Sequence, residues 1–199
     1  ILTHFNLINA AKNLTEQEEM KKNDDYFSFL PLSWVNEKVV STVVPLIIGF
    51  ATNFPEKPHT VMVDLREIGP QTLLAPPRVY QSLMSNFIIR MEGASWFKRK
   101  VYGLFKKYGD KKAVADANNE VLSGMDKLMY FLGDAMIFSA IRDHLGLGRL
   151  RRAYVAGAAL QQDAFHFYHS IGVNLKQTYG GTEVAGIAFV QPDRQIKSG

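Results

Sequence analysis

The sequence has no cysteine among its 199 residues. Disulfide bonds, zinc–thiolate sites and a cysteine nucleophile are therefore excluded. The absence fits a reducing compartment, and we predict a cytoplasmic location. A long hydrophobic run is also lacking. The most apolar stretch, Val39 to Ala51, contains Ser41, Thr42 and Pro45 and is shorter than the roughly 20 residues of a membrane span, so it predicts a buried helix.

Several short catalytic motifs are absent as well. The sequence has no HExxH, no GxSxG and no Walker A motif, and Gly146-Leu147-Gly148 lacks the third glycine of GxGxxG. A Ser-His-Asp hydrolase therefore has little support. His166 and His169 stand three residues apart on a predicted helix among aromatic residues. A metal pair is one interpretation, and a packed, half-exposed helix surface is the one we favour.

The charge balance is mild, with a net charge of +4 at pH 7 and 47% hydrophobic residues, which is typical of a globular domain. Basic and aromatic residues are interleaved from Trp96 to Lys112. The pattern predicts an amphipathic helix with a solvated basic face. Peripheral contact with an anionic membrane through residues 96–112 is the alternative, and we expect no nucleic-acid partner.

Helix-like and strand-like segments alternate along the chain. Helical spacing of apolar residues predicts helices over residues 6–12, 39–48, 77–91, 96–116 and 125–147, and β-favouring runs predict strands at 26–30, 60–63, 72–75, 153–155 and 173–175. Residues Glu16 to Asp25 predict a solvated loop, and Asp64 predicts a cap for the turn after the strand at 60–63. The alternation predicts an α/β fold with a mostly parallel sheet flanked by helices.

The stretch from Arg151 to Val190 carries the candidate site. The apolar run at 153–155 breaks into Ala156-Gly157-Ala158-Ala159-Leu160, and after a helical segment a second run leads into Tyr179-Gly180-Gly181-Thr182-Glu183. Right-handed crossovers place both predicted turns at the carboxyl ends of neighbouring parallel strands, where ligands bind in open α/β sheets.

The second predicted turn has the chemistry of a nucleotide site. Gly180 and Gly181 allow close backbone approach, Tyr179 offers a face for stacking, and Thr182 a hydroxyl for a phosphate oxygen. Glu183 is a hard oxygen donor of the kind that Mg²⁺ accepts. The alternative, which we weight about equally on spacing alone, is a Gly-Gly turn with Tyr179 in the core and Thr182 and Glu183 on the surface.

Four segments taken in order resemble one family. They are Leu30-Pro31-Leu32-Ser33-Trp34-Val35-Asn36-Glu37, Ala75-Pro76-Pro77-Arg78-Val79-Tyr80, the turn at 155–160 and Tyr179-Gly180-Gly181-Thr182-Glu183. Together they are similar to the AMP-forming acyl-CoA synthetases of the adenylate-forming superfamily, in particular the long-chain fatty-acid enzymes. Trp34 departs from the usual His or other aromatic, and Ala156 from the usual Gly. The resemblance implies that residues 1–199 are the central part of the AMP-binding domain, without its phosphate loop and C-terminal domain. The chain starts at Ile1 and ends at Gly199 after a strand-like run, which also predicts a piece of a longer protein.

The resemblance implies activation of a long-chain fatty acid with ATP and transfer of the acyl group to coenzyme A. Carried over from the family, Thr182 and Glu183 would be catalytic, and Glu183 would hold Mg²⁺. The residues implied for ATP/AMP are Gly157, Ala158, Ala159, Thr178, Tyr179 and Gly180, and those implied for the acyl substrate are Trp34 and Gly181. A fatty-acyl-AMP ligase that loads a carrier protein and a non-enzymatic membrane-surface module are the alternatives. We expect this chain alone to be nearly inactive.

Overall fold

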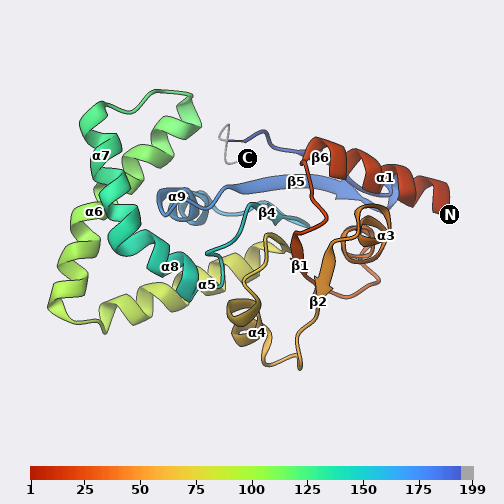
Figure 1. Ribbon diagram of the computed structural model, residues 1–199, viewed down its shortest axis with the longest axis horizontal. Helices are drawn as coiled ribbons and strands as arrows, with labels where there is room; N and C mark the ends of the chain where they lie inside the picture. Colours follow the sequence, from red (N-terminus) through yellow and green to blue (C-terminus); the bar gives the residue numbers. More distant parts are fainter. Residues whose placement is uncertain (194–199) are drawn as a thin grey trace.

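A computed structural model describes residues 1–193, so the last residues of the predicted domain, 194–199, lie outside the described part (Figure 1). The strands are β1 (Asp25–Phe27), β2 (Ala51–Asn53), β3 (Thr72–Ala75), β4 (Arg152–Val155), β5 (Leu175–Gly181) and β6 (Gly186–Val190). They form one sheet in the order β2-β1-β3-β4-β5-β6, in which only β6 is antiparallel to its neighbour. The predicted fold class is confirmed.

Helices cover both faces of the sheet. The helices are α1 (His4–Gln17), α2 (Val35–Lys38), η1 (Val39–Val43), α3 (Val44–Ile48), α4 (Val61–Ile68), α5 (Pro77–Glu92), α6 (Trp96–Asn118), α7 (Gly124–Gly133), η2 (Asp134–Phe138), α8 (Ser139–His144) and α9 (Gln162–Ser170), and Thr182–Val184 form the 3₁₀ turn η3. η1 and η2 are π-helical turns inside longer helices. Figure 1 shows α6 and α7 beyond α9, away from the sheet, and α8 beside α5.

Alternate strand residues enter two separate cores. Leu73 and Val155 join the core beneath α5 and α9, whereas Leu74 and Tyr154 join the core beneath α1 and η1. Successive side chains of a strand point to opposite faces, so a strand covered on both faces is apolar at nearly every position. This explains why the short continuous runs at 72–75 and 153–155 predicted β3 and β4 correctly.

The predicted strand at Thr60–Val63 is wrong, because these residues start α4. Val61, Leu65 and Ile68 recur at helical spacing on the inner side, while Val63 is exposed. Burial of that stripe outweighs the β propensity of the first residues. Asp64 therefore caps no turn after a strand. Its carboxylate accepts hydrogen bonds from the Thr60 hydroxyl and the Glu56 backbone N–H at 2.6 and 2.9 Å.

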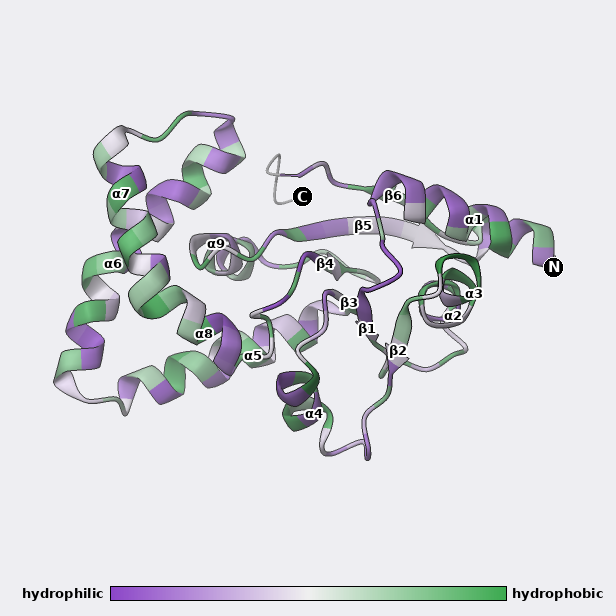
Figure 2. Cartoon of the chain, viewed as in Figure 1, coloured by the Kyte–Doolittle hydropathy of each residue, from purple (hydrophilic) through white to green (hydrophobic). Residues whose placement is uncertain are grey.

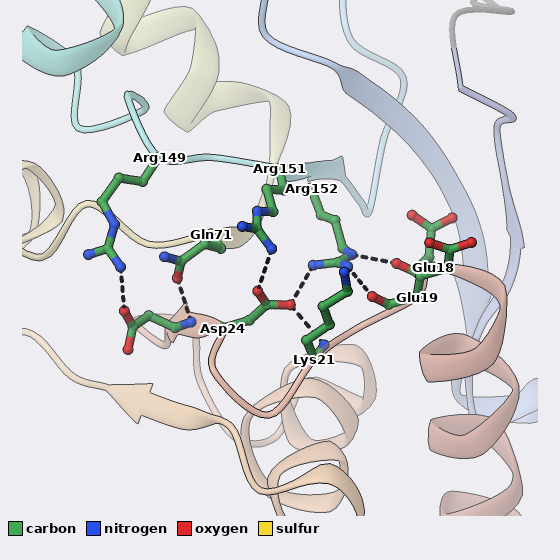
Figure 3. Close-up of polar contacts among 9 residues, drawn as sticks. Glu18, Glu19, Lys21, Asp24, Gln71, Arg149, Arg151 and Arg152 are labelled. Carbon is green, nitrogen blue, oxygen red and sulfur yellow. Dashed lines mark hydrogen bonds and ion pairs between the residues drawn. The ribbon is translucent and has the colours of Figure 1, made fainter.

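The prediction of a solvated loop from Glu16 to Asp25 is also wrong in part. Asp24 is 2% exposed and pairs with Arg152 (2.7 Å) and Arg151 (3.3 Å) at the amino-terminal end of β4 (Figure 3). Arg152 also donates from Nε to the Glu18 carbonyl (2.6 Å). Glu18 pairs through its side chain with buried Lys176 of β5 (2.8 Å). The charges of this segment thus hold the end of α1 against the sheet.

Other predictions are met with local differences. Gly49 ends α3 in the left-handed region (φ 78°), and Pro77 opens α5. The predicted helix at 125–147 is divided into α7, η2 and α8 and ends at His144. No helix within residues 1–193 has the length and apolar character needed to cross a bilayer.

The two spaced histidines are packed rather than arranged for metal. The His169 ring is buried and its Nε2 contacts the Leu175 carbonyl at 2.8 Å; burial lowers the pKa of His169 to about 4. His166 contacts Asp110 at 3.0 Å. No group of three or more candidate metal ligands occurs in the part of the chain that the structure describes.

Candidate functional site

The first loop of the site, residues 156–160, follows β4 directly, and we call it the β4 loop. Gly157 lies in the left-handed region (φ 91°), which an L side chain rarely adopts. Gly157, Ala158 and Ala159 are exposed, whereas Leu160 packs into the core. The β4 loop therefore presents small residues and backbone at the carboxyl end of β4, where a flat ligand can approach closely.

Gln177 of β5 fastens the β4 loop. Its Nε2 donates to the Ala158 carbonyl at 2.9 Å, and its Oε1 accepts the Leu160 backbone N–H at 3.2 Å. One carboxamide thus satisfies a donor and an acceptor of the loop together. The sequence analysis did not single out Gln177, although a polar residue between buried Lys176 and Thr178 directly before the Tyr179 motif was an available signal.

Thr178 makes a second link between the strands. Its hydroxyl is buried and donates to the Val155 carbonyl at 2.8 Å. The side chain therefore holds β5 against the end of β4, and a contact between Thr178 and a nucleotide stays a prediction. Because β4 and β5 are neighbouring parallel strands, the β4 loop and the Tyr179 motif meet at one edge of the sheet, as predicted.

The prediction of a tight turn at 179–183 is wrong for its first residues. Tyr179 to Gly181 continue β5 and pair with antiparallel β6, and the chain turns only at η3. The register is irregular between Tyr179 and Gly180. A Cβ atom on Gly180 would lie 2.0 Å from the Gly186 carbonyl oxygen. Close approach of the two strands is therefore sufficient to require glycine at position 180.

The side chains of the motif face outward. Tyr179 is 73% exposed, and its ring centroid lies 6.3 Å from that of Phe189. Thr182 and Glu183 are exposed as well. The alternative is therefore wrong about Tyr179, which is not in the core, and correct that Thr182 and Glu183 lie on the surface. All three side chains are accessible to a ligand.

The Glu183 carboxylate is exposed and lies beside Gly181. Its Oε2 lies 3.0 Å from the position that a Cβ on Gly181 would take, so the carboxylate folds back over that glycine. Mg²⁺ in nucleotide sites commonly binds one or two carboxylates, substrate phosphates and water. An exposed carboxylate beside open backbone fits this role.

Trp34 lies at the same edge of the sheet as the β4 loop. It directly precedes α2, and its Cζ3 lies 3.8 Å from the position of a Cβ on Gly157. The side chain is 43% exposed, so one part of the ring meets the β4 loop and another part is accessible. The structure thus brings Trp34 together with the residues implied for the nucleotide.

Glu37 anchors α2, the helix that begins directly after Trp34. Its buried carboxylate accepts hydrogen bonds from the Tyr26 and Ser28 hydroxyls, both at 2.5 Å. Burial raises the pKa of Glu37, and the two hydrogen bonds oppose that rise in part. Nearby, the buried Oδ1 of Asn36 has no hydrogen-bond partner in the described part of the chain and lies 3.3 Å from the Cβ position of Gly186.

Comparison with known proteins shows the family of the chain. The model of the family described as "AMP-binding enzyme" matches residues 1–199. The chain belongs to this family. It is 25% identical over 195 residues to the long-chain-fatty-acid–CoA ligase ACSBG2 of Rattus norvegicus, covering 94% of this chain and 28% of that protein. It is 26% identical over 205 residues to long chain acyl-CoA synthetase 8 of Arabidopsis thaliana, covering 97% and 28%.

The match to a solved structure concerns the fold. A benzoate CoA ligase from Burkholderia xenovorans LB400 superposes with a TM-score of 0.58 at 18% identity, over 99% of this chain and 30% of that one. The chain therefore spans less than a third of each of these proteins. The comparisons thus show the family and the fold.

Proposed function

We propose that residues 1–199 form the central part of the AMP-binding domain of a long-chain-fatty-acid–CoA ligase. The observation that carries the proposal is the meeting of the β4 loop, Trp34 and the Tyr179 motif at one sheet edge, with Gln177 joining the loop to β5. The names of the similar proteins support a fatty acid as the activated carboxylate. In this assignment the family's phosphate loop and C-terminal domain lie outside residues 1–199.

The proposed reaction has two steps. In the first, the carboxylate of the fatty acid attacks the α-phosphorus of ATP, which forms acyl-AMP and releases pyrophosphate. In the second, the thiol of coenzyme A attacks the acyl carbon, which forms the thioester and releases AMP. The first step develops charge on phosphate oxygens, so the protein contributes mainly positioning and electrostatic stabilisation.

In this proposal each part of the site has one role. Tyr179 and the β4 loop enclose the adenine, and Thr182 donates its hydroxyl to an α-phosphate oxygen. Glu183 would hold Mg²⁺, which would supply charge neutralisation at the phosphates when bound. Trp34 and Gly181 border the acyl group. Gly180 allows β5 and β6 to pair closely, and only its backbone would contact the nucleotide.

The test is Glu183→Ala in the intact enzyme that carries this chain. Loss of the carboxylate should lower fatty-acid-dependent ATP–pyrophosphate exchange by about 10²- to 10³-fold, the usual effect of removing one group that stabilises developing charge. The exposed Glu16→Ala on α1 is the matched control and should retain exchange. Exchange near the normal rate in Glu183→Ala, with the fold intact, would refute the metal role.

The acyl acceptor separates this proposal from its nearest alternative. A fatty-acyl-AMP ligase would release its product only to a carrier protein, so AMP release that depends on coenzyme A distinguishes the two.

We also propose a cytoplasmic protein in peripheral contact with an anionic membrane through residues 96–112. The exposed Trp96 and the exposed basic side chains of Lys98, Arg99 and Lys100 on α6 support that contact.

A further inference from the structure

A cluster of basic groups without acidic partners lies outside the proposed nucleotide site. Arg66 of α4, Arg90 of α5 and His144 of α8 line one groove, and Arg90 Nη1 lies 2.7 Å from His144 Nε2. Burial, reinforced by the charges of Arg90 and Arg66, lowers the pKa of His144. Neither arginine forms an ion pair with any of residues 1–193. Two positive arginines without a counter-charge, beside an imidazole whose lowered pKa keeps it neutral at neutral pH, suit an anionic ligand.

One larger, apolar groove adjoins this basic cluster. It has a volume of about 470 Å³ and runs between α5, α6 and the η2–α8 segment, and its apolar lining includes Phe97, Val101 and Met136. The groove that the basic cluster itself lines has a volume of about 180 Å³, lies towards α4 and also includes Met62 and Val63. Both grooves share Arg90 and His144. The π-helical turn η2, a form of helix frequent at functional sites, forms part of the larger wall.

Two apolar side chains that line the larger groove, Phe97 and Met136, are more than 60% exposed. Ile89 of α5 and Trp96 of α6, which do not line the groove, are exposed to a similar degree. Figure 2 shows hydrophobic and hydrophilic residues alternating along α5 to α8, and the exposed Lys98, Arg99 and Lys100 follow Phe97 directly. Exposed apolar groups in this concentration usually mark an interaction surface.

We propose that this face of α4, α5, α6 and α8, together with η2, docks on an anionic phospholipid membrane, with lipid phosphates bound at Arg66, Arg90 and His144. The inference rests on the membrane contact of the proposed function and extends it from α6 to a defined headgroup site. A single fatty acid in the larger groove would contact Phe97 but would leave Trp96 in water. A membrane interface accommodates both groups, because aromatic rings sit at the headgroup level and basic side chains reach the phosphates.

The experiment measures binding of the full chain to vesicles by co-sedimentation. Phosphatidylcholine vesicles containing phosphatidylserine are compared with vesicles of phosphatidylcholine alone. The test variant is Arg66→Gln/Arg90→Gln, and the matched control is Lys12→Gln/Lys22→Gln, which removes the same charge from exposed positions on α1 and the following loop. Each basic group near an anionic surface strengthens binding roughly fivefold, so the test variant should bind about 25-fold more weakly and the control nearly normally.

Two further variants distinguish binding at the headgroup site from binding through α6 alone. Trp96→Ser/Phe97→Ser should weaken binding without unfolding the chain, because both side chains are exposed. Lys98→Gln/Arg99→Gln tests the α6 contact alone. Normal binding of Arg66→Gln/Arg90→Gln, with loss only in the α6 variant, would overturn the headgroup site and leave the proposed contact through 96–112 in place. If the original chain bound equally to both vesicle types, the headgroup site and the contact through residues 96–112 would both be overturned. The ligase proposal is judged separately, by pyrophosphate exchange.

Discussion

At the scale of single residues, the site depends on a carboxamide that need not touch substrate. Gln177 bonds both Ala158 and Leu160, so it fixes the backbone that would face the adenine. Motif matching finds the residues that contact a ligand, whereas a positioning residue is visible only once neighbouring strands are placed. This is why motif matching singled out Tyr179, Thr182 and Glu183, whose roles stay predictions, and passed over Gln177.

Gln177→Glu should raise the KM for ATP more than the KM for the fatty acid. A carboxylate cannot donate to the Ala158 carbonyl, and an unsatisfied or repulsive contact of this kind costs about 1–3 kcal/mol, or roughly 5- to 150-fold in affinity. The measurement is steady-state kinetics of the intact enzyme with each substrate varied in turn. The exposed Gln162→Ala on α9 is the control. Equal changes in both KM values would indicate a general structural effect and contradict the positioning role.

The requirement for glycine at position 180 can be tested by measuring the free energy of unfolding alone. Gly180→Ala places a methyl group against the Gly186 carbonyl and should lower the free energy of unfolding by about 1–3 kcal/mol, the usual cost of overpacking. Gly103→Ala in α6 is the matched control, since nothing lies within 4 Å of its Cβ position, and it should raise the free energy of unfolding by about 0.5–1 kcal/mol. Denaturant unfolding measures both. Unchanged stability in Gly180→Ala would show that β5 and β6 are less closely apposed.

At the scale of elements, apolar runs predicted those strands that are buried on both faces. β3 and β4 were found for this reason, and α5 was found because Pro77 opens it ahead of the Leu83 and Phe87 stripe. The start of α4 was mistaken for a strand, since four β-favouring residues are too few to reveal a helical stripe that continues to Ile68. The extension of β5 through Gly181 was missed because a Gly-Gly pair usually signals a turn, and only its pairing with β6 makes it a strand.

The α2 element carries a pH-dependent contribution through Glu37. Burial raises the pKa of this acid on folding, so its contribution to stability is full below the unfolded pKa, ordinarily 4.5, and is lost as pH rises through the raised folded pKa. Relative to Glu37→Gln, the original chain should therefore lose stability between acidic and neutral pH, by roughly 1.4 kcal/mol for each unit of the rise. Urea unfolding across this pH range checks the sign. Parallel curves for the two proteins would remove Glu37 as the cause.

At the scale of the whole molecule, opposite ends of the sheet have different tasks. The amino-terminal ends of β4 and β5 carry the ion pairs of Arg152 with Asp24 (Figure 3) and of Lys176 with Glu18, which hold the end of α1. The carboxyl ends of the same strands carry the proposed site. The helices α5 to α8 add a layer whose exposed face suits a membrane. The ion-pair end could not be predicted from sequence, because Asp24 and Arg152 are distant in the chain and each looks like an ordinary surface residue.

The most direct test is a crystal structure of the intact enzyme with an acyl-adenylate analogue. The account predicts the adenine between the Tyr179 ring and residues Gly157 to Ala159, and the phosphate within hydrogen-bond distance of the Thr182 hydroxyl. The acyl group should begin beside Gly181 and Trp34. An adenine bound elsewhere, with Tyr179 and Thr182 still open to solvent, would contradict the account.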